Sequence, residues 1–179
     1  MSNPLRAFKH CLSNLINFSD RDRRVVFWPY VGFIVATLML VTMVAIIAIM
    51  GPAMVLAANT TADVVDFPVD ELVLFLRLYF LIVLVIIFLL AAAVARRLHD
   101  AGMTAYFGLL PLPNLIFGLY YLPKVISEVL ESGPTNGASF ETLFINNMIY
   151  LTLVTILIVL LAQPSSKNDN KYGHAPQED

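Results

Sequence analysis

Four long stretches of this sequence contain no Asp, Glu, Lys or Arg. They cover residues 25–62, 78–95, 101–123 and 142–166. A helix needs about 20 predominantly apolar residues to cross the hydrocarbon layer of a membrane. Four such stretches are more than the interior of one small soluble domain can hold. We therefore predict an all-α integral membrane protein with four transmembrane helices, forming a single membrane domain over residues 1–179.

Composition supports this class and argues against several functions. Hydrophobic residues make up 59% of the chain and charged residues 13%, against about 45–50% and about 25% in soluble domains. A single cysteine, Cys11, cannot form an intrachain disulfide. The three histidines are far apart and lack metal-ligand spacing, so we expect no metal site and no cofactor. The chain also lacks the basic domain that a nucleic-acid partner requires.

The uncharged stretches and their flanking residues give the expected boundaries. We predict a cytoplasmic amphipathic and basic leader at 1–24, spans at 25–51, 72–95, 103–123 and 143–162, and a cytoplasmic tail at 163–179. The first apolar run is too long for a signal peptide, whose apolar core has about 7–15 residues, so we interpret it as a retained anchor. Gly51-Pro52 is expected to end the first span. Pro111 and Pro113 predict a kink in the third span, and residues 124–131 a short surface helix.

The leader carries two helix signals. Apolar residues recur at helical spacing over residues 4–17, which predicts an amphipathic helix. Two interpretations remain open for this helix, one in the membrane interface and one packed on the protein's own loops. Ser19 and Asp22 have the spacing of a capping box, which predicts that a helix begins at Asp20 and continues into the first span. Trp28 and Tyr30 would then lie at headgroup depth.

The basic residues indicate how the chain is oriented. With four spans, nine of the eleven Lys and Arg residues fall on the side that holds both termini: Arg6, Lys9, Arg21, Arg23, Arg24, Arg96, Arg97, Lys167 and Lys171. The loop over residues 53–71 has four acidic residues and no basic ones. Basic residues stay on the cytoplasmic side during insertion. We therefore predict a multi-pass protein of the plasma membrane with both termini in the cytoplasm.

Three polar motifs share that predicted cytoplasmic face. They supply the candidate ligand-binding residues Arg21, Arg24, Arg96, Arg97, His99, Asp100, Asn170 and Tyr172. Arginine holds phosphate through two parallel hydrogen bonds, so an anionic lipid headgroup or a small anionic solute is the natural ligand. Structural interpretations compete with this one. The first arginines set topology, and Asp100 either pairs with Arg97 at i, i+3 or caps the next turn.

Several other polar residues have structural interpretations. Arg77 lies inside the second span near its outer end, where its long side chain reaches the interface or pairs with Asp70. Asn114 is expected to form a hydrogen bond across helices. The Asn59-Thr60-Thr61 triplet fits the short glycosylation pattern.

The motifs also carry a family resemblance. They are Phe18-Ser19-Asp20-Arg21-Asp22-Arg23-Arg24 followed by Phe27-Trp28, then Arg96-Arg97-Leu98-His99-Asp100-Ala101-Gly102, then Asn170-Lys171-Tyr172-Gly173. In this order they resemble the bacterial inner-membrane family known as domain of unknown function 805. Asp20 stands where that family usually has Gly, Val26 where an acidic residue is common, and Tyr106 where Trp is common. The resemblance implies a multi-span inner-membrane protein whose biochemical role is unassigned.

Three functions follow as hypotheses, in order of preference. The first is a non-enzymatic protein whose cytoplasmic Arg, His and Asp surface binds an anionic lipid headgroup or small solute, as part of a transport step. The second is a membrane scaffold or assembly subunit that holds a protein partner or a second copy of itself. The third is a membrane enzyme that uses His99 and Asp100 as an acid–base pair on a lipid phosphate.

The four-span topology makes a direct prediction. A reporter that is active only outside the cytoplasm should be active when fused after Asp63 and inactive when fused after His99, because the second span separates them. A fusion after Asp179 serves as the control and should also be inactive. Equal activity at Asp63 and His99 would contradict the topology, as would recovery of the intact chain as a water-soluble monomer without detergent.

Overall fold

The computed structural model describes residues 4–59, 69–132 and 138–174. These residues contain helices and no named strand. In chain order the helices are α1 (Pro4–Ser13), α2 (Arg24–Asn59), α3 (Val69–Asp100), the 3-10 helix η1 (Ala105–Leu109), α4 (Leu112–Ser132) and α5 (Ala138–Leu161). The predicted all-α class is confirmed.

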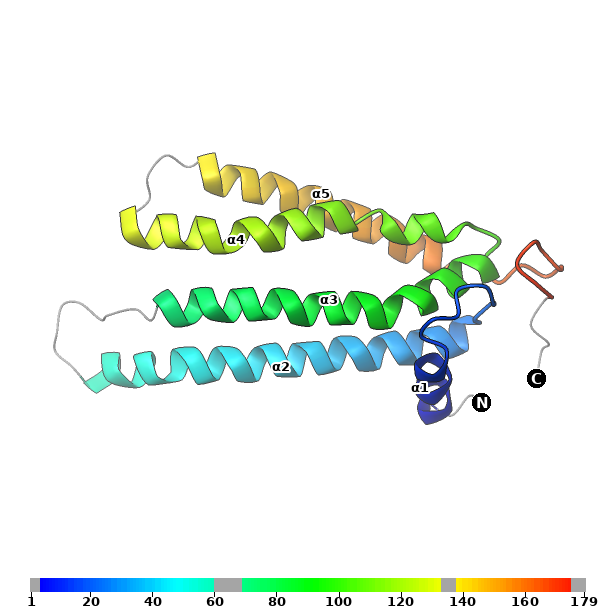
Figure 1. The fold of residues 1–179 in the computed structure, drawn as a ribbon, viewed down its shortest axis with the longest axis horizontal. Helices are drawn as coiled ribbons and strands as arrows, with labels where there is room; N and C mark the ends of the chain where they lie inside the picture. The colour runs from blue at the N-terminus through cyan, green and yellow to red at the C-terminus, as the bar shows by residue number, and fades with distance from the viewer. Residues whose placement is uncertain (1–3, 60–68, 133–137, 175–179) are drawn as a thin grey trace.

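Four helical segments are long and apolar enough to cross a membrane. They are Arg24–Ile49, Leu72–Asp100, Ala105–Glu128 and Ser139–Leu161. They run side by side along the long axis of the molecule (Figure 1). Many large apolar side chains on these segments face outward, among them Met39, Ile47 and Phe88. Such a surface is stable only where lipid or another apolar surface covers it. The prediction of a four-span membrane protein is confirmed.

The helix ends differ in part from the expectations. α2 continues as a helix through Gly51-Pro52 to Asn59, although the candidate membrane span within it ends at Ile49, close to the expected boundary. Neighbouring groups in membrane helices often compensate for the hydrogen bond that a proline removes. Residues 124–131 belong to α4 and form no separate helix. The kink expected in the third span is a break between η1 and α4, and Pro113 lies in the first turn of α4, where its missing N–H costs nothing.

The helices form two antiparallel pairs, α2 with α3 and α4 with α5, joined mainly through α3 (Figure 1). Small residues allow close packing where α3 ends, because Ala93 and Ala95 are buried there. Gly108 of η1 serves the same purpose, since a Cβ at this position would lie 2.9 Å from Val94 Cγ1. Buried Tyr30 donates a hydrogen bond to the Leu89 carbonyl at 2.8 Å. The buried core lies at this one end of the bundle: Cys11, Phe27, Tyr30, Ile34, Ala93, Leu98 and Leu161.

Helix α1 lies across the first turns of α2 (Figure 1). It is shorter than the predicted helix over residues 4–17. Ala7 and Cys11 are buried, and the Phe8 ring packs edge-on against Phe33 with centroids 4.5 Å apart. Leu5 and Ile16 remain 76% and 82% exposed. The leader therefore packs against its own protein with one face and leaves apolar side chains uncovered.

Candidate functional site

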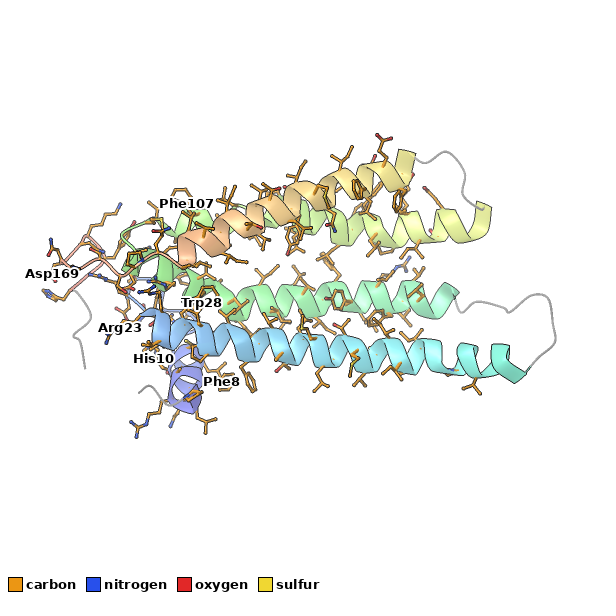
Figure 2. All side chains as sticks on the ribbon, turned by 180° about the vertical axis from the view of Figure 1, so that it is seen from behind. Phe8, His10, Arg23, Trp28, Phe107 and Asp169 are labelled. Carbon is orange, nitrogen blue, oxygen red and sulfur yellow. The ribbon has the colours of Figure 1, made fainter. Side chains whose placement is uncertain are left out.

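A buried cluster of charged residues forms where α3 ends. We call it the clasp and define it as Arg21, Asp22, Arg96, Arg97 and Asp100. The side chains of all five are less than 5% exposed. The cluster lies at the end of the bundle that carries α1 and the C-terminal segment, the end where His10, Arg23 and Asp169 are labelled in Figure 2. Charged residues are rarely this buried unless they are paired.

Arg96 joins α3 to the segment between α1 and α2. Its Nε donates to Asp22 Oδ2 at 2.6 Å. Its Nη1 donates to the carbonyl oxygens of Asn14 and Asn17, each at 2.6 Å. The backbone adds a further link, since the Asp22 N–H donates to the Arg96 carbonyl at 3.2 Å. His10 Nε2 lies 3.0 Å from the other Asp22 oxygen. Arg96 therefore fixes the N-terminal segment on the end of α3.

Arg97 joins α3 to the end of α5. Its Nε donates to the Leu161 carbonyl at 2.9 Å, and its Nη2 donates to the Gln163 carbonyl. The last carbonyl groups of a helix lack partners within that helix, so this guanidinium caps α5. Arg97 Nη1 also donates to Asp100 Oδ2 at 2.5 Å. The i, i+3 ion pair predicted between these two residues is confirmed.

Asp100 and Arg21 hold the segment that follows α5. Asp100 accepts a hydrogen bond from Ser165 Oγ at 2.5 Å, and its carbonyl accepts one from the Ser166 N–H at 2.8 Å. Arg21 Nη2 lies 3.4 Å from Asp100 Oδ1. The same Nη2 donates to the Ser166 carbonyl at 2.8 Å, and Nη1 donates to the Gly173 carbonyl at 3.2 Å. The segment before α2 and the segment after α5 thus meet on Asp100.

The Asn-Lys-Tyr-Gly motif of the tail docks on His99. Asn170 Nδ2 donates to the His99 carbonyl at 3.0 Å, while Asn170 Oδ1 accepts from the Tyr172 N–H at 2.9 Å. The Tyr172 ring stacks on the His99 ring with centroids 3.7 Å apart and planes 7° apart. Gly173 has φ of 134°, a conformation that favours glycine. Each defining residue of the motif therefore has a structural role in docking the tail.

The clasp has more positive than negative charge. It contains three guanidinium groups and two carboxylates, which leaves a net charge of +1 when all are ionised. Among the described residues, the buried side-chain nitrogens without a hydrogen-bond partner are Arg21 Nε, Arg96 Nη2 and His99 Nδ1. All three lie in or beside the clasp.

One predicted helix start is wrong. α2 begins at Arg24, and no helix starts at Asp20. The Asp22 carboxylate is bonded to Arg96 and lies 3.0 Å from His10. A carboxylate held this way by a distant guanidinium no longer serves the capping box that was inferred from its spacing to Ser19.

The structure brings together seven of the eight candidate residues: Arg21, Arg96, Arg97, His99, Asp100, Asn170 and Tyr172. Arg24 is exposed at the edge, with Nη1 3.5 Å from the Ala162 carbonyl. The sequence did not reveal the roles of Asp22 and Ser165, because their partners are 74 and 65 residues away along the chain. In the sequence, the only sign that Asp22 forms an ion pair is its position as an acidic residue among arginines.

The remaining polar predictions have mixed outcomes. Asn114 does bond across helices, since its Nδ2 donates to Asn146 Oδ1 at 3.0 Å, so that prediction is confirmed. Arg77 is exposed on α3. The side chains of Asp70 and Asn59 lie outside the described part of the structure, and so do Thr60 and Thr61 of the glycosylation pattern. Within the described ranges, no three His, Cys, Asp or Glu side chains are arranged to hold a metal ion.

A polar cavity of about 270 Å³ opens beside the clasp. Three segments form its walls, namely α1, the segment before α2, and the tail. The lining residues are His10, Asp20, Arg21, Asp22, Tyr172, Gly173 and His174. Among the described side chains of this wall, Arg21 has a buried donor, Nε, without a partner in the protein, and a bound group would satisfy it.

The fold and the clasp define a multi-pass, all-α membrane protein whose two ends are fastened to one transmembrane helix. Comparison with known proteins gives the family. Residues 15–174 match the family described as Protein of unknown function (DUF805), and the chain belongs to it. No curated protein and no solved structure matches the chain.

Replacing Asp100 tests the clasp. We expect Asp100→Asn to lower the free energy of unfolding by about 3–5 kcal/mol, because Arg97 and Arg21 would keep buried positive charge without a counter-ion. Thermal unfolding of the purified protein in detergent measures this. Asp20→Asn is the matched control, since Asp20 is exposed and bonded to nearby Asn17. Equal melting temperatures for the two variants would contradict a stabilising role for the Asp100 carboxylate.

The single cysteine reports on the docking of α1. Burial, with a smaller effect of Asp22, raises the pKa of Cys11 from 9.0 to about 11. Because the thiolate is the reactive form, a maleimide should label Cys11 slowly below pH 9 and rapidly once the chain is unfolded. Arg96→Ala should speed labelling at least tenfold by freeing the segment after α1, and Arg24→Ala should not. Rapid labelling of the folded wild-type protein would contradict this docking.

Proposed function

We propose that this is a non-enzymatic protein of the bacterial inner membrane, with both termini in the cytoplasm, whose clasp end binds anionic lipid headgroups. In Figure 1, α1 and the described C-terminal segment lie at the end of the bundle where α3 finishes. The basic residues of the leader and tail that the structure describes therefore lie at the same end of the molecule. Their concentration on one side supports the cytoplasmic orientation by the positive-inside rule.

One observation carries the proposal: the clasp buries the carboxylates Asp22 and Asp100 together with three arginines, and five other basic side chains at this end of the molecule are exposed. Among the described residues of the leader and tail, the exposed acids are Asp20 and Asp169. The exposed bases are Arg6, Lys9, Arg24, Lys167 and Lys171. A basic side chain near an anionic membrane surface contributes about 1 kcal/mol to binding. This excess of basic residues favours anionic headgroups beside the clasp.

Helix α1 is suited to the membrane interface. It lies across α2, and its neighbouring Leu5 and Arg6 are both exposed. A helix in the interface places apolar side chains among the acyl chains and basic ones among the headgroups. Trp28, 37% exposed near the start of α2, fits the same depth. The two interpretations of the leader are therefore compatible in our proposal, with one face on α2 and the other toward lipid.

The clasp residues position this surface in our proposal and do not contact the lipid themselves. The guanidinium groups of Arg96 and Arg97 already donate to carboxylates and backbone carbonyls. The Asp100 carboxylate is likewise taken up by Arg97, Ser165 and Arg21. This arrangement disfavours the acid–base pair proposed for His99 and Asp100, because a general base needs a free oxygen within reach of its substrate.

A second candidate function is binding of a small anionic solute in the cavity of about 270 Å³. The observation that favours it is the unpartnered Arg21 Nε on the cavity wall. If this solute site exists, soluble glycerol phosphate should occupy it and should compete with binding of the anionic lipid phosphatidylglycerol. No competition is expected if the exposed bases bind the headgroup at the membrane surface. A protein partner or second copy would instead be recovered by crosslinking.

Neutralising the exposed bases tests the lipid proposal. The quadruple variant Arg6→Gln, Lys9→Gln, Lys167→Gln and Lys171→Gln should lose at least about tenfold of the wild-type preference for phosphatidylglycerol over phosphatidylcholine, because each base contributes roughly 1 kcal/mol. Native mass spectrometry of protein released from mixed nanodiscs measures the bound lipids. Lys124→Gln is the control, since Lys124 is exposed on α4, away from the leader and the tail. Equal lipid retention in the quadruple variant would overturn the proposal.

A further inference from the structure

A second cavity lies between α4 and α5, in the transmembrane part of the molecule. Its volume is about 180 Å³. Two asparagines meet at its wall: Asn114 Nδ2 donates to Asn146 Oδ1, and Asn146 Nδ2 donates to the Asn114 carbonyl, both at 3.0 Å. Gly118 makes room for this pair, because a Cβ there would lie 3.1 Å from Asn146 Nδ2. The lining residues are Asn114, Leu115, Gly118, Leu119, Leu122, Leu143, Asn146, Asn147 and Tyr150.

The asparagine pair lies well inside the apolar segments. Asn146 is seven residues after Ser139, where the last candidate span begins, which corresponds to roughly 10 Å along a helix. Asn114 is fourteen residues before Glu128, where the third candidate span ends, or roughly 21 Å. Since the hydrocarbon layer is about 30 Å thick, the cavity falls within it. Polar groups at this depth must find partners other than bulk water.

The cavity wall has unused hydrogen-bonding capacity. A side-chain amide has two N–H donors and an acceptor oxygen. The bonds between Asn114 and Asn146 use one donor of each amide. The second donors remain, and the Asn147 amide and the Tyr150 hydroxyl also line the cavity. Donors and acceptors therefore converge on a small space that is otherwise walled by leucines.

We propose that this cavity binds the head of a neutral, hydroxyl-bearing lipid. The lining contains no Asp, Glu, Lys, Arg or His, so a charged head would have no counter-charge in hydrocarbon. A hydroxyl both donates and accepts, which matches the amide N–H and oxygen groups. Ligand pockets that enclose a whole drug-sized molecule measure about 300–1,000 Å³. This smaller cavity holds a head alone, and the lipid tail lies along Leu119 and Leu122 among the surrounding acyl chains.

Photo-crosslinking of the full chain in nanodiscs tests the proposal. The probes are hexadecanol carrying a diazirine near its hydroxyl, and the matching methyl ether, which cannot donate a hydrogen bond. The alcohol should label the α4 and α5 peptides that line the cavity about fivefold more than the ether does, as expected for loss of one hydrogen bond. Excess unlabelled hexadecanol should suppress this labelling.

Two variants on α5 distinguish binding of the alcohol in the cavity from general contact between lipid and the helix surface. Asn147→Leu removes a lining amide without touching the pair of Asn114 and Asn146, and should abolish the preference for the alcohol. Thr152→Leu is the matched control, because Thr152 lies outside the cavity and donates to its own helix at the Met148 carbonyl. The control should retain the wild-type preference.

Two results would overturn the proposal: equal labelling by the alcohol and the ether, or equal loss of the preference in both variants. The proposal depends on the four-span fold and is independent of headgroup binding at the clasp. Failure of either proposal is therefore distinguishable from failure of the other.

Discussion

The burial of Arg96 and Arg97 at the end of α3 sets the strongest constraint on this structure. A buried guanidinium is tolerated only when counter-charges and hydrogen-bond acceptors compensate its lost hydration. The acceptors come from three separate segments: the stretch between α1 and α2, the end of α5, and the segment after it. The first of these segments must therefore reach α3 for Arg96 to remain inside, and the other two must reach it for Arg97. The ion pairs with Asp22 and Asp100 make the positions of the two chain ends depend on one another.

Other kinds of interaction hold the rest of the bundle together. Between helices in lipid there is little hydrophobic driving force, because the acyl chains are as apolar as leucine. Specific association then comes from close packing and from interhelical hydrogen bonds. Near the clasp, Ala93 and Gly108 permit close contact between the helices. Farther along α4 and α5, the bonds between Asn114 and Asn146 supply the second fixed point. Between these points most large side chains face outward.

Errors in reading the sequence arose where a local signal competed with a distant partner. Ser19 and Asp22 fit a capping box, but Arg96 holds the Asp22 carboxylate and the helix begins at Arg24. Gly51-Pro52 signals a break, yet α2 continues past it. The arginine and histidine motif marked candidate ligand-binding residues, and the structure adds that these side chains are buried and that Arg96, Arg97 and Asp100 are bonded within the chain. Local patterns report the preferences of a short segment, and for Asp22 the outcome was decided by a group outside that segment, Arg96.

The sequence by itself determined the class of protein, the four apolar helices and the uneven distribution of basic residues, because apolarity and charge belong to each residue wherever it lies. It also marked nearly all the residues that meet at the clasp. Only the tertiary structure decided which of them are buried and what each one binds. The partners are as far apart as Arg21 and Gly173, separated by 152 positions. No pattern along the chain specifies such a contact, since it exists only after the helices have packed and both ends have folded back onto α3.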